Sequence, residues 1–238
     1  MKQRLTAAIL ALLLLLPACG TQKTPRERAE EKYLPKIQDA LAAVKGSARD
    51  TLSDVTFDFD PADAYVGPSA EDREKYGGGK VYEERDSEYF DAICDLVIEN
   101  LPQDASTYDK YRYLACFLSY CLNYDHSSLS LMDITPYGAI TGGNAVCLGY
   151  ANSFLYLCER AGLWCRVVSG FASWNGEEHG WNLVKLEDGT YYVDVTWCDQ
   201  YGEPSSKAWS RCFMLTEERL AQDHGIWNGG PATGKTIY

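Results

Sequence analysis

The sequence predicts an α+β fold in which amphipathic helices pack on an antiparallel sheet. Apolar side chains recur at helical spacing in the first half of the chain and again directly after Cys147. Residues 164–170, 178–185 and 191–197 are instead rich in β-branched and aromatic side chains, which is typical of strands. The segment 186–189, which ends in Asp-Gly, predicts a hairpin between the strands at 178–185 and 191–197.

Three helices are predicted before the middle of the chain. Residues 33–44, 82–101 and 107–124 each place apolar side chains on a single helical stripe. Pro102 ends the second of these segments, because the residue before a proline is disfavoured in helical conformation. Between the first two helices, residues 55–60 alternate apolar and acidic side chains, which predicts a short, half-exposed strand.

A fourth helix is predicted from Cys147, and Gly162 supplies its C-terminal stop. The preceding residues 127–143 are interpreted as a long connection in which substrate contacts would be natural. Tyr137 in this connection has two readings, as an oxyanion donor beside the Cys147 backbone N–H or as a core residue. Towards the C-terminus, residues 209–215 predict a last strand and a short helix follows it.

The first 18 residues predict a lipoprotein signal peptide. Lys2 and Arg4 precede the apolar run 5–16, which is too short for an ordinary membrane-spanning helix. The run ends in Leu-Pro-Ala-Cys, which resembles a lipobox, so we expect cleavage before Cys19 and a lipid on its thiol. Secretion without lipidation is the alternative. The expected location is the cell envelope, with the membrane contacted through the N-terminal lipid.

The chain of 238 residues suits one domain with a small extension. After the signal peptide (1–18), we expect a polar tether at 19–31, a helical extension packing on the core at 32–106, and the principal domain at 107–238. The net charge of −12 excludes nucleic acid as a partner, because no basic stripe exists to neutralise phosphates. No Cys or His cluster has zinc spacing, so neither a metal nor a cofactor is expected.

Cys147 is the candidate nucleophile. A glycine-rich approach delivers it to the start of a predicted helix, where backbone N–H groups and the positive end of the helix dipole favour a thiolate. Gly143 and Gly149 beside it would let a substrate backbone approach without Cβ collisions. Eight cysteines remain when Cys19 is set aside, and we expect mostly free, buried thiols, with the pairing of Cys198 left open.

His179 and Asp194 are candidates for the base and its orienting group. A thiol nucleophile needs a base to take its proton, and the base needs a third group to fix its tautomer. A two-residue turn at Asp188-Gly189 would leave Asp194 far from His179 along the hairpin. A loop over 186–189 would place Asp194 opposite Trp181 and diagonal to His179, within reach of a hydrogen bond. His126 has no second ligand candidate nearby and is interpreted as solvated, whereas His224 has no nucleophile partner in sequence and is interpreted as structural.

Four blocks occur in order around these residues: Gly143-x-x-Val146-Cys147-x-Gly149-Tyr150-Ala151, Ala161-Gly162-Leu163 with Val168-x-Gly170, His179-x-Trp181-Asn182-x-Val184, and Tyr192-Val193-Asp194-Val195-Thr196-Trp197. Over roughly residues 108–199 they resemble the bacterial transglutaminase-like domain. Asn123-Tyr124-Asp125 resembles the "-YD" ending of the helix before the nucleophile in that family. Two departures are Gly180, where Ala is common, and Cys198, where an acidic residue often follows the Trp.

The resemblance implies a papain-like fold and a catalytic triad of Cys147, His179 and Asp194. It implies a thiol enzyme that cleaves or transfers acyl groups at peptide or carboxamide bonds through a thioester, with hydrolysis favoured over cross-linking. Its partner would be a protein or peptide substrate, for example one of the cell envelope. The alternative is a non-catalytic surface lipoprotein that uses the cleft to bind a peptide or glycan, although such a protein would not need all three residues.

Overall fold

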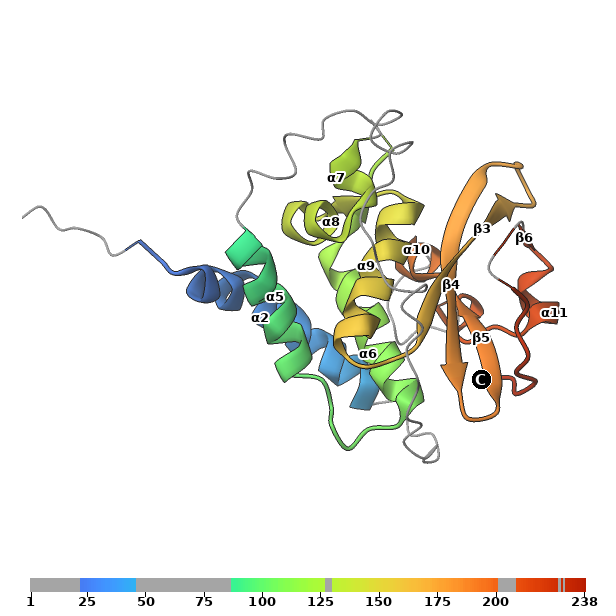
Figure 1. The fold of residues 1–238 in the computed structure, drawn as a ribbon, viewed down its shortest axis with the longest axis horizontal. Coiled ribbons are helices and arrows are strands. Elements are labelled where there is room, and N and C mark those ends of the chain that lie inside the picture. The colour runs from blue at the N-terminus through green and yellow to red at the C-terminus, as the bar shows by residue number, and fades with distance from the viewer. Residues whose placement is uncertain (1–21, 46–86, 127–129, 201–208, 227, 229) are drawn as a thin grey trace, which may run out of the picture.

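The computed structural model describes residues 22–45, 87–126, 130–200, 209–226, 228 and 230–238. The expected signal peptide, the lipidated Cys19 and the strand expected at 55–60 lie outside these residues. Within them, a group of helices lies on one side of a four-stranded antiparallel sheet, as the α+β prediction required (Figure 1). No helix among the described residues is both long and apolar enough to span a membrane.

The helical layer begins with α2 (Pro25–Lys45) and α5 (Ser87–Glu99), which lie farthest from the sheet, and continues with α6 (Thr107–Cys121) (Figure 1). The central helix α6 packs on α2 and also on the helices nearer the sheet. Tyrosine hydroxyls fasten this layer, since Tyr33 donates to the carbonyl of Ile140 at 2.6 Å and Tyr113 to the carbonyl of Val97 at 2.9 Å. These bonds satisfy phenol groups whose rings are buried.

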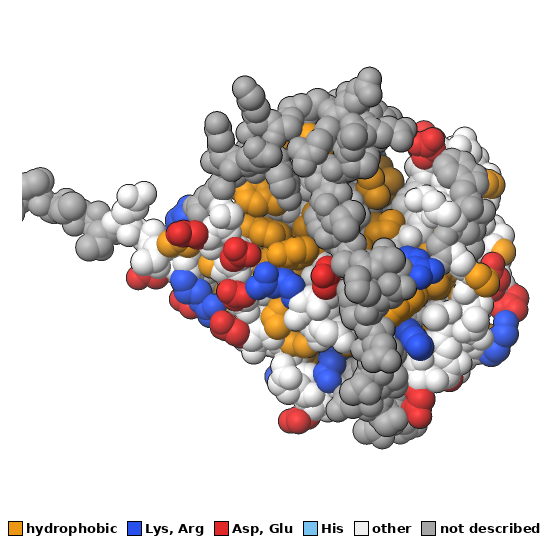
Figure 2. Space-filling view, viewed as in Figure 1, with side chains coloured by type: hydrophobic (Ala, Val, Ile, Leu, Met, Phe, Trp, Pro, Cys, Tyr) orange, Lys and Arg blue, Asp and Glu red, His pale blue; other side chains and the backbone are white. Residues whose placement is uncertain are grey.

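Helix α2 starts earlier than the sequence analysis expected. The segment 25–31 was assigned to a polar tether, but it forms the first turns of the helix. Thr24 and Glu27 exchange a reciprocal pair of backbone-to-side-chain hydrogen bonds, and Pro25 occupies the first helical position. Ala29 is fully buried, while charged side chains of both signs gather over this end of the molecule (Figure 2). The capping sequence Thr-Pro-Arg-Glu was therefore a missed helix signal.

The segment before the nucleophile is helical, whereas a long loop was expected. It contains α7 (Leu131–Ile134) and α8 (Pro136–Gly142), capped by Ser130 and Thr135 respectively. Short parallel strands β1 (Asn123–Tyr124) and β2 (Asn144–Ala145) then join the end of α6 to the residues before α9 (Cys147–Arg160). This pairing places Tyr124 beside Ala145 and so brings it close to Cys147.

The sheet has the strand order β5-β4-β3-β6, and every pairing within it is antiparallel. Its strands are β3 (Cys165–Ala172), β4 (Glu178–Leu186), β5 (Gly189–Val193) and β6 (His224–Ile226). Lys185 pairs with Thr190 and Asn182 with Val193, which is the register expected from the longer loop. The loop itself is shorter than expected, because Leu186 pairs with Gly189 and the turn consists of Glu187 and Asp188. Helix α9 packs on β3 and β4, while α11 (Glu217–Leu220) contacts β5 on the other side of the sheet (Figure 1).

Two strand expectations were wrong. The strand expected over 191–197 stops at Val193, and helix α10 (Val195–Gln200) begins after Asp194. The carboxylate Oδ1 of Asp194 accepts the Trp197 backbone N–H at 3.1 Å, so this aspartate turns the chain from strand to helix. The strand expected at 209–215 is a 3-10 turn followed by a single bridge between Leu215 and Tyr192.

Candidate active site

Cys147 is the first residue of α9, the helix that packs on β3 and β4. The residue before it, Val146, is extended, and its side chain makes no capping hydrogen bond. The thiol is partly exposed, whereas the other seven described cysteines are buried, and none of the eight forms a disulfide. Cys147 is therefore placed as a reactive cysteine would be, at a helix start and open to reagents.

The two glycines beside Cys147 serve the fold, which corrects the expectation that they make room for substrate. A Cβ added at Gly149 would lie 2.0 Å from the backbone oxygen of Asp133, so the absent side chain lets α7 approach α9 closely. Gly143 has φ +83° and caps the end of α8 in the left-handed conformation. Both residues fix where α9 starts, and so they position Cys147 indirectly.

His179 and Asp194 meet across the hairpin. The imidazole Nε2 of His179 lies 2.8 Å from Oδ2 of Asp194. The Asp194 side chain is fully buried and that of His179 is 8% exposed. Asp194 needs no strand conformation for this contact, because the chain turns into α10 at that residue and its other carboxylate oxygen caps the helix.

The electrostatics favour a charged imidazole. Burial favours the neutral ring, but the charge of Asp194 and its hydrogen bond, together with the hydrogen bond to Cys147, raise the pKa of His179 to about 10. Burial likewise opposes ionisation of Asp194, yet the charge and hydrogen bond of His179 outweigh it and hold the pKa of that carboxyl well below its usual range. The pair is therefore an imidazolium and a carboxylate at neutral pH.

The Cys147 side chain lies close enough to His179 to raise the pKa of the imidazole. Because Nε2 of the ring faces Asp194, the nitrogen left for the sulfur is Nδ1. The structure thus brings the three residues singled out in the sequence into one row of sulfur, imidazole and carboxylate. Such a row can generate a thiolate, hold the matching proton on the ring and keep that ring in one orientation.

Tyr124 lies beside the Cys147 backbone N–H, at the start of α9. Burial and the nearby Cys147 and Glu177 raise the pKa of its phenol to about 12, while a backbone hydrogen bond from Cys147 acts in the opposite direction. A bond that favours the phenolate is one that the oxygen accepts, so the donor is the Cys147 N–H. Tyr137, the residue considered for this place, packs in the core against Phe90 at a ring distance of 5.5 Å.

His224 is the second residue that the sequence analysis did not place in the site. Its Nε2 lies 3.2 Å from Oδ2 of Asp194, the same oxygen that His179 contacts, and its Nδ1 lies 2.6 Å from Oδ1 of Asp223. The ring is 4% exposed. The sequence analysis interpreted His224 as structural and gave it no place in the site, but the pairing of β6 with β3 carries it to Asp194.

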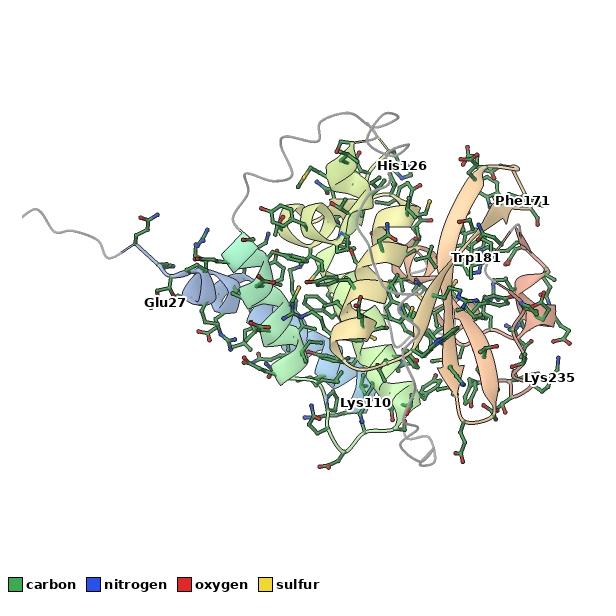
Figure 3. All side chains as sticks on the ribbon, in the orientation of Figure 1. Glu27, Lys110, His126, Phe171, Trp181 and Lys235 are labelled. Atoms are coloured by element: carbon green, nitrogen blue, oxygen red, sulfur yellow. The ribbon has the colours of Figure 1, made fainter. Side chains whose placement is uncertain are left out.

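Two tryptophans enclose the imidazoles. The ring of Trp197 stacks on His179 at 5.3 Å and lies 4.1 Å from His224, while Trp181 lies 5.7 Å and 4.7 Å from the same two rings. Figure 3 shows Trp181 on β4 within the sheet layer. These rings remove water from around the His179–Asp194 contact, which strengthens it electrostatically.

His179, Asp194 and His224 are also the one group among the described residues with the ligand types and spacing to hold a metal ion, all three ligand atoms lying within 4.8 Å of one another. The contacts of 2.8 and 3.2 Å to the shared oxygen are ordinary hydrogen-bond lengths. A metal among these atoms would displace the hydrogen bond that orients His179. The arrangement is therefore better suited to holding protons than to holding a cation.

The middle of the chain is similar in sequence to known proteins. Residues 92–198, from within α5 to α10, match the Transglutaminase-like superfamily. The chain is 29% identical over 117 residues to the kyphoscoliosis peptidase of Homo sapiens and 28% identical over 118 residues to that of Mus musculus. These alignments cover 43% and 44% of this chain but 18% of each relative, so the chain spans about a fifth of the length of the curated relatives it matches.

Two solved structures are also similar. One is described as a TGase, with a TM-score of 0.40 and 19% identity, over 48% of this chain and 34% of that chain. The other is a protein of Cytophaga hutchinsonii provisionally described as a cysteine protease, with a TM-score of 0.38 and 16% identity, over 52% and 47% of the two chains.

Proposed function

We propose, from the premise that residues 92–198 form a transglutaminase-like domain, that this chain is a thiol enzyme acting on peptide or carboxamide bonds. The observation that carries the proposal is the row formed by Cys147, His179 and Asp194, in which the carboxylate is fully buried and the sulfur is partly exposed. A binding module would have no need of this arrangement. In it, a buried carboxylate holds an imidazole, and that imidazole lies beside the partly exposed thiol of Cys147.

The first half-reaction follows from the protonation states. The Cys147 thiolate attacks the carbonyl carbon of the substrate, a C–S bond forms, and the carbonyl oxygen becomes an oxyanion. The Tyr124 hydroxyl, whose oxygen accepts the Cys147 backbone N–H, can donate its own hydrogen to that oxygen. His179 then gives its Nδ1 proton to the departing amine nitrogen as the C–N bond breaks, leaving a thioester and a neutral imidazole.

The second half-reaction regenerates the enzyme. The neutral His179 takes a proton from water or from an incoming amine, which attacks the thioester carbonyl, and the sulfur leaves as the thiolate paired with imidazolium. Water gives hydrolysis, whereas an amine gives a new amide bond. We favour hydrolysis, with peptide substrates in the cell envelope and attachment of the protein there through a lipid on Cys19.

The test uses the soluble form of residues 20–238. It is incubated with envelope-derived peptides, with and without a primary amine, and products are identified by mass spectrometry. We expect cleavage products in water and no reaction by Cys147→Ala, while exclusive formation of amine adducts would reassign the chain to acyl transfer. Absence of both products, together with equal alkylation rates for all eight thiols, would contradict the proposal and favour a binding module.

Thiol labelling provides a test that needs no substrate. Burial raises the pKa of Cys116 and Cys121 to about 12, and it also raises the pKa of Cys94, Cys158 and Cys198. Iodoacetamide at pH 6 should therefore modify Cys147 first in the folded protein, by at least about tenfold in rate. Peptide mapping by mass spectrometry identifies the modified site, and Cys147→Ala should remove the fast reaction.

A further inference from the structure

Asp194 is shared by two imidazoles. His179 and His224 approach the same carboxylate oxygen, Oδ2, at 2.8 and 3.2 Å, while the other oxygen accepts the Trp197 N–H. The proposed reaction uses only the first imidazole. The second is nevertheless among the most buried polar side chains of the described structure, and its other nitrogen is held by Asp223 at 2.6 Å.

The sheet explains how the two rings meet. His179 on β4 pairs with Gly170 and His224 on β6 pairs with Ala172, so both histidines flank β3 and project from the same face. The partners on β3 carry at most a methyl group, which leaves room for large rings above the strand. A Cβ added at Gly170 would lie 2.6 Å from Cη2 of Trp181, the ring that packs edge-on against His224.

The result is a chain of alternating groups that leads from the surface to the sulfur. Asp223, which is half exposed, contacts His224, and His224 contacts Asp194. Asp194 contacts His179, which contacts Cys147. Both ring nitrogens of His224 therefore face carboxylate oxygens.

We propose that His224 is a positioning residue that fixes the Asp194 carboxylate toward His179 and, through it, sets the reactivity of Cys147. A buried carboxylate with one partner on Oδ2 could rotate about its side-chain torsions or shift toward the α10 backbone. Two imidazoles on one oxygen, with the Trp197 N–H on the other, hold it from three directions. Asp223 in turn fixes the orientation of the His224 ring. The inference rests on the proposed function, since it concerns the same nucleophile.

Other titratable groups surround Asp194 without donating to it. Its charge acts on Cys198 in α10 and on Tyr124 in β1, and Cys212 contributes a backbone carbonyl that accepts the Asp194 N–H at 2.8 Å. The Cys198 thiol lies beside the thiol of Cys212 without a disulfide, and Tyr124 lies beside Cys147. Among the described residues, His179 and His224 are therefore the two side chains that hydrogen-bond to this carboxylate.

The experiment measures the second-order rate of Cys147 alkylation by iodoacetamide at pH 6 in the full chain, with the site confirmed by peptide mapping. His224→Phe fills the ring space without a donor, and we expect it to slow alkylation about tenfold or more. His224→Gln retains an N–H donor at a similar reach, and we expect it to stay within about threefold of the unmodified chain. Thermal unfolding of each variant separates folding from reactivity.

Two results with the His224 variants would overturn the proposal. One is a folded His224→Phe protein that reacts within twofold of the unmodified chain, which would make the role of His224 purely structural. The other is a His224→Gln protein as slow as His224→Phe, which would show that the ring matters and the donor does not. A change in the unmodified chain's alkylation rate on treatment with a chelator would also overturn it, because the cluster would then hold a metal.

Asp223→Ala keeps the test decisive if His224→Phe does not fold. Asp223 is 47% exposed, so its removal leaves the core intact while releasing the His224 ring. We expect alkylation to slow about threefold, and a rate equal to that of the unmodified chain would then reject the positioning role. Failure of the proposed function is distinguishable throughout, because in that case the unmodified chain itself has no fast-reacting thiol.

Discussion

Nε2 of His179 and Oδ2 of Asp194 lie 2.8 Å apart although 15 residues separate them in the chain. The hairpin register brings the two residues near each other, and the turn into α10 directs the carboxylate to the ring. The contact is enclosed by Trp181 and Trp197, so it lies in a region of low effective dielectric. Both the protonation and the orientation of the imidazole depend on it.

Replacing the carboxylate by an amide tests this dependence. Asp194→Asn keeps the side-chain shape and an oxygen for the Trp197 N–H, so the fold should persist. The turnover number should fall about 100-fold or more, because the ring loses its fixed tautomer and its charge partner. Asp188→Asn, in the exposed turn of the same hairpin, is the control and should retain activity. A loss of less than tenfold in Asp194→Asn would remove Asp194 from the catalytic machinery.

The ion pair also predicts how stability changes with pH. The pKa of His179 is raised from 6.5 to about 10, so its contribution to the free energy of unfolding is complete below pH 6.5 and is lost between pH 6.5 and 10. The pKa of Asp194 is lowered from 3.8, so its contribution is present above pH 3.8 and is lost as the pH falls below that value. The two contributions are complete together between about pH 4 and 6.5.

Urea unfolding of the unmodified chain and of His179→Gln at pH 5, 7, 8.5 and 10 measures this effect. The difference in unfolding free energy should be greatest at pH 5 and shrink by a few kcal/mol by pH 10, since each pKa unit corresponds to about 1.4 kcal/mol. A difference that stays constant across this interval would mean that folding does not raise the pKa of His179.

Replacement by alanine should have opposite effects on stability at Gly149 and at Gly180. A Cβ at Gly149 would lie 2.0 Å from the Asp133 oxygen, so Gly149→Ala must move α7 or α9. We expect a loss of about 1–3 kcal/mol in unfolding free energy and slower alkylation of Cys147. A Cβ at Gly180 would meet nothing closer than 3.7 Å, so Gly180→Ala should be neutral or stabilise by up to about 1 kcal/mol. Equal melting temperatures for the two variants would contradict this contrast.

Much of the fold was predictable from local patterns. The sequence analysis assigned helices α5, α6 and α9 and strands β3 and β4 correctly. In these segments the spacing of apolar residues indicates which face of the helix or strand is buried. The end of β5 at Val193 was missed, since the aromatic and β-branched residues that follow have strand propensity but are drawn into α10 by the Asp194 cap. Tertiary context overrode propensity at that point.

The site was predictable where its residues share motifs, and it was missed where contacts are non-local. Cys147, His179 and Asp194 were found from their order and spacing. His224 reaches Asp194 only because β6 pairs with β3, and three residues of strand leave little pattern in a sequence. Tyr124 was noted within a motif, but its place beside the Cys147 N–H depends on the parallel pairing of β1 with β2.

That pairing leads to a prediction about the oxyanion. The Tyr124 oxygen accepts the Cys147 N–H, and a pKa of about 12 keeps its phenol protonated at neutral pH. Its own hydrogen is then available for the oxygen of a tetrahedral intermediate. Tyr124→Phe should therefore lower the turnover number about 10- to 100-fold with little change in KM, because the lost bond forms only as charge develops.

Two controls locate this effect. Tyr137→Phe removes a hydroxyl from a tyrosine packed against Phe90 in the core, and it should leave the turnover number within about twofold. Alkylation of Cys147 by iodoacetamide passes through no oxyanion, so Tyr124→Phe should leave that rate nearly unchanged while acyl transfer slows. If alkylation slows as much as acyl transfer, Tyr124 acts on the thiol or on the start of α9, and the oxyanion must be stabilised by other groups.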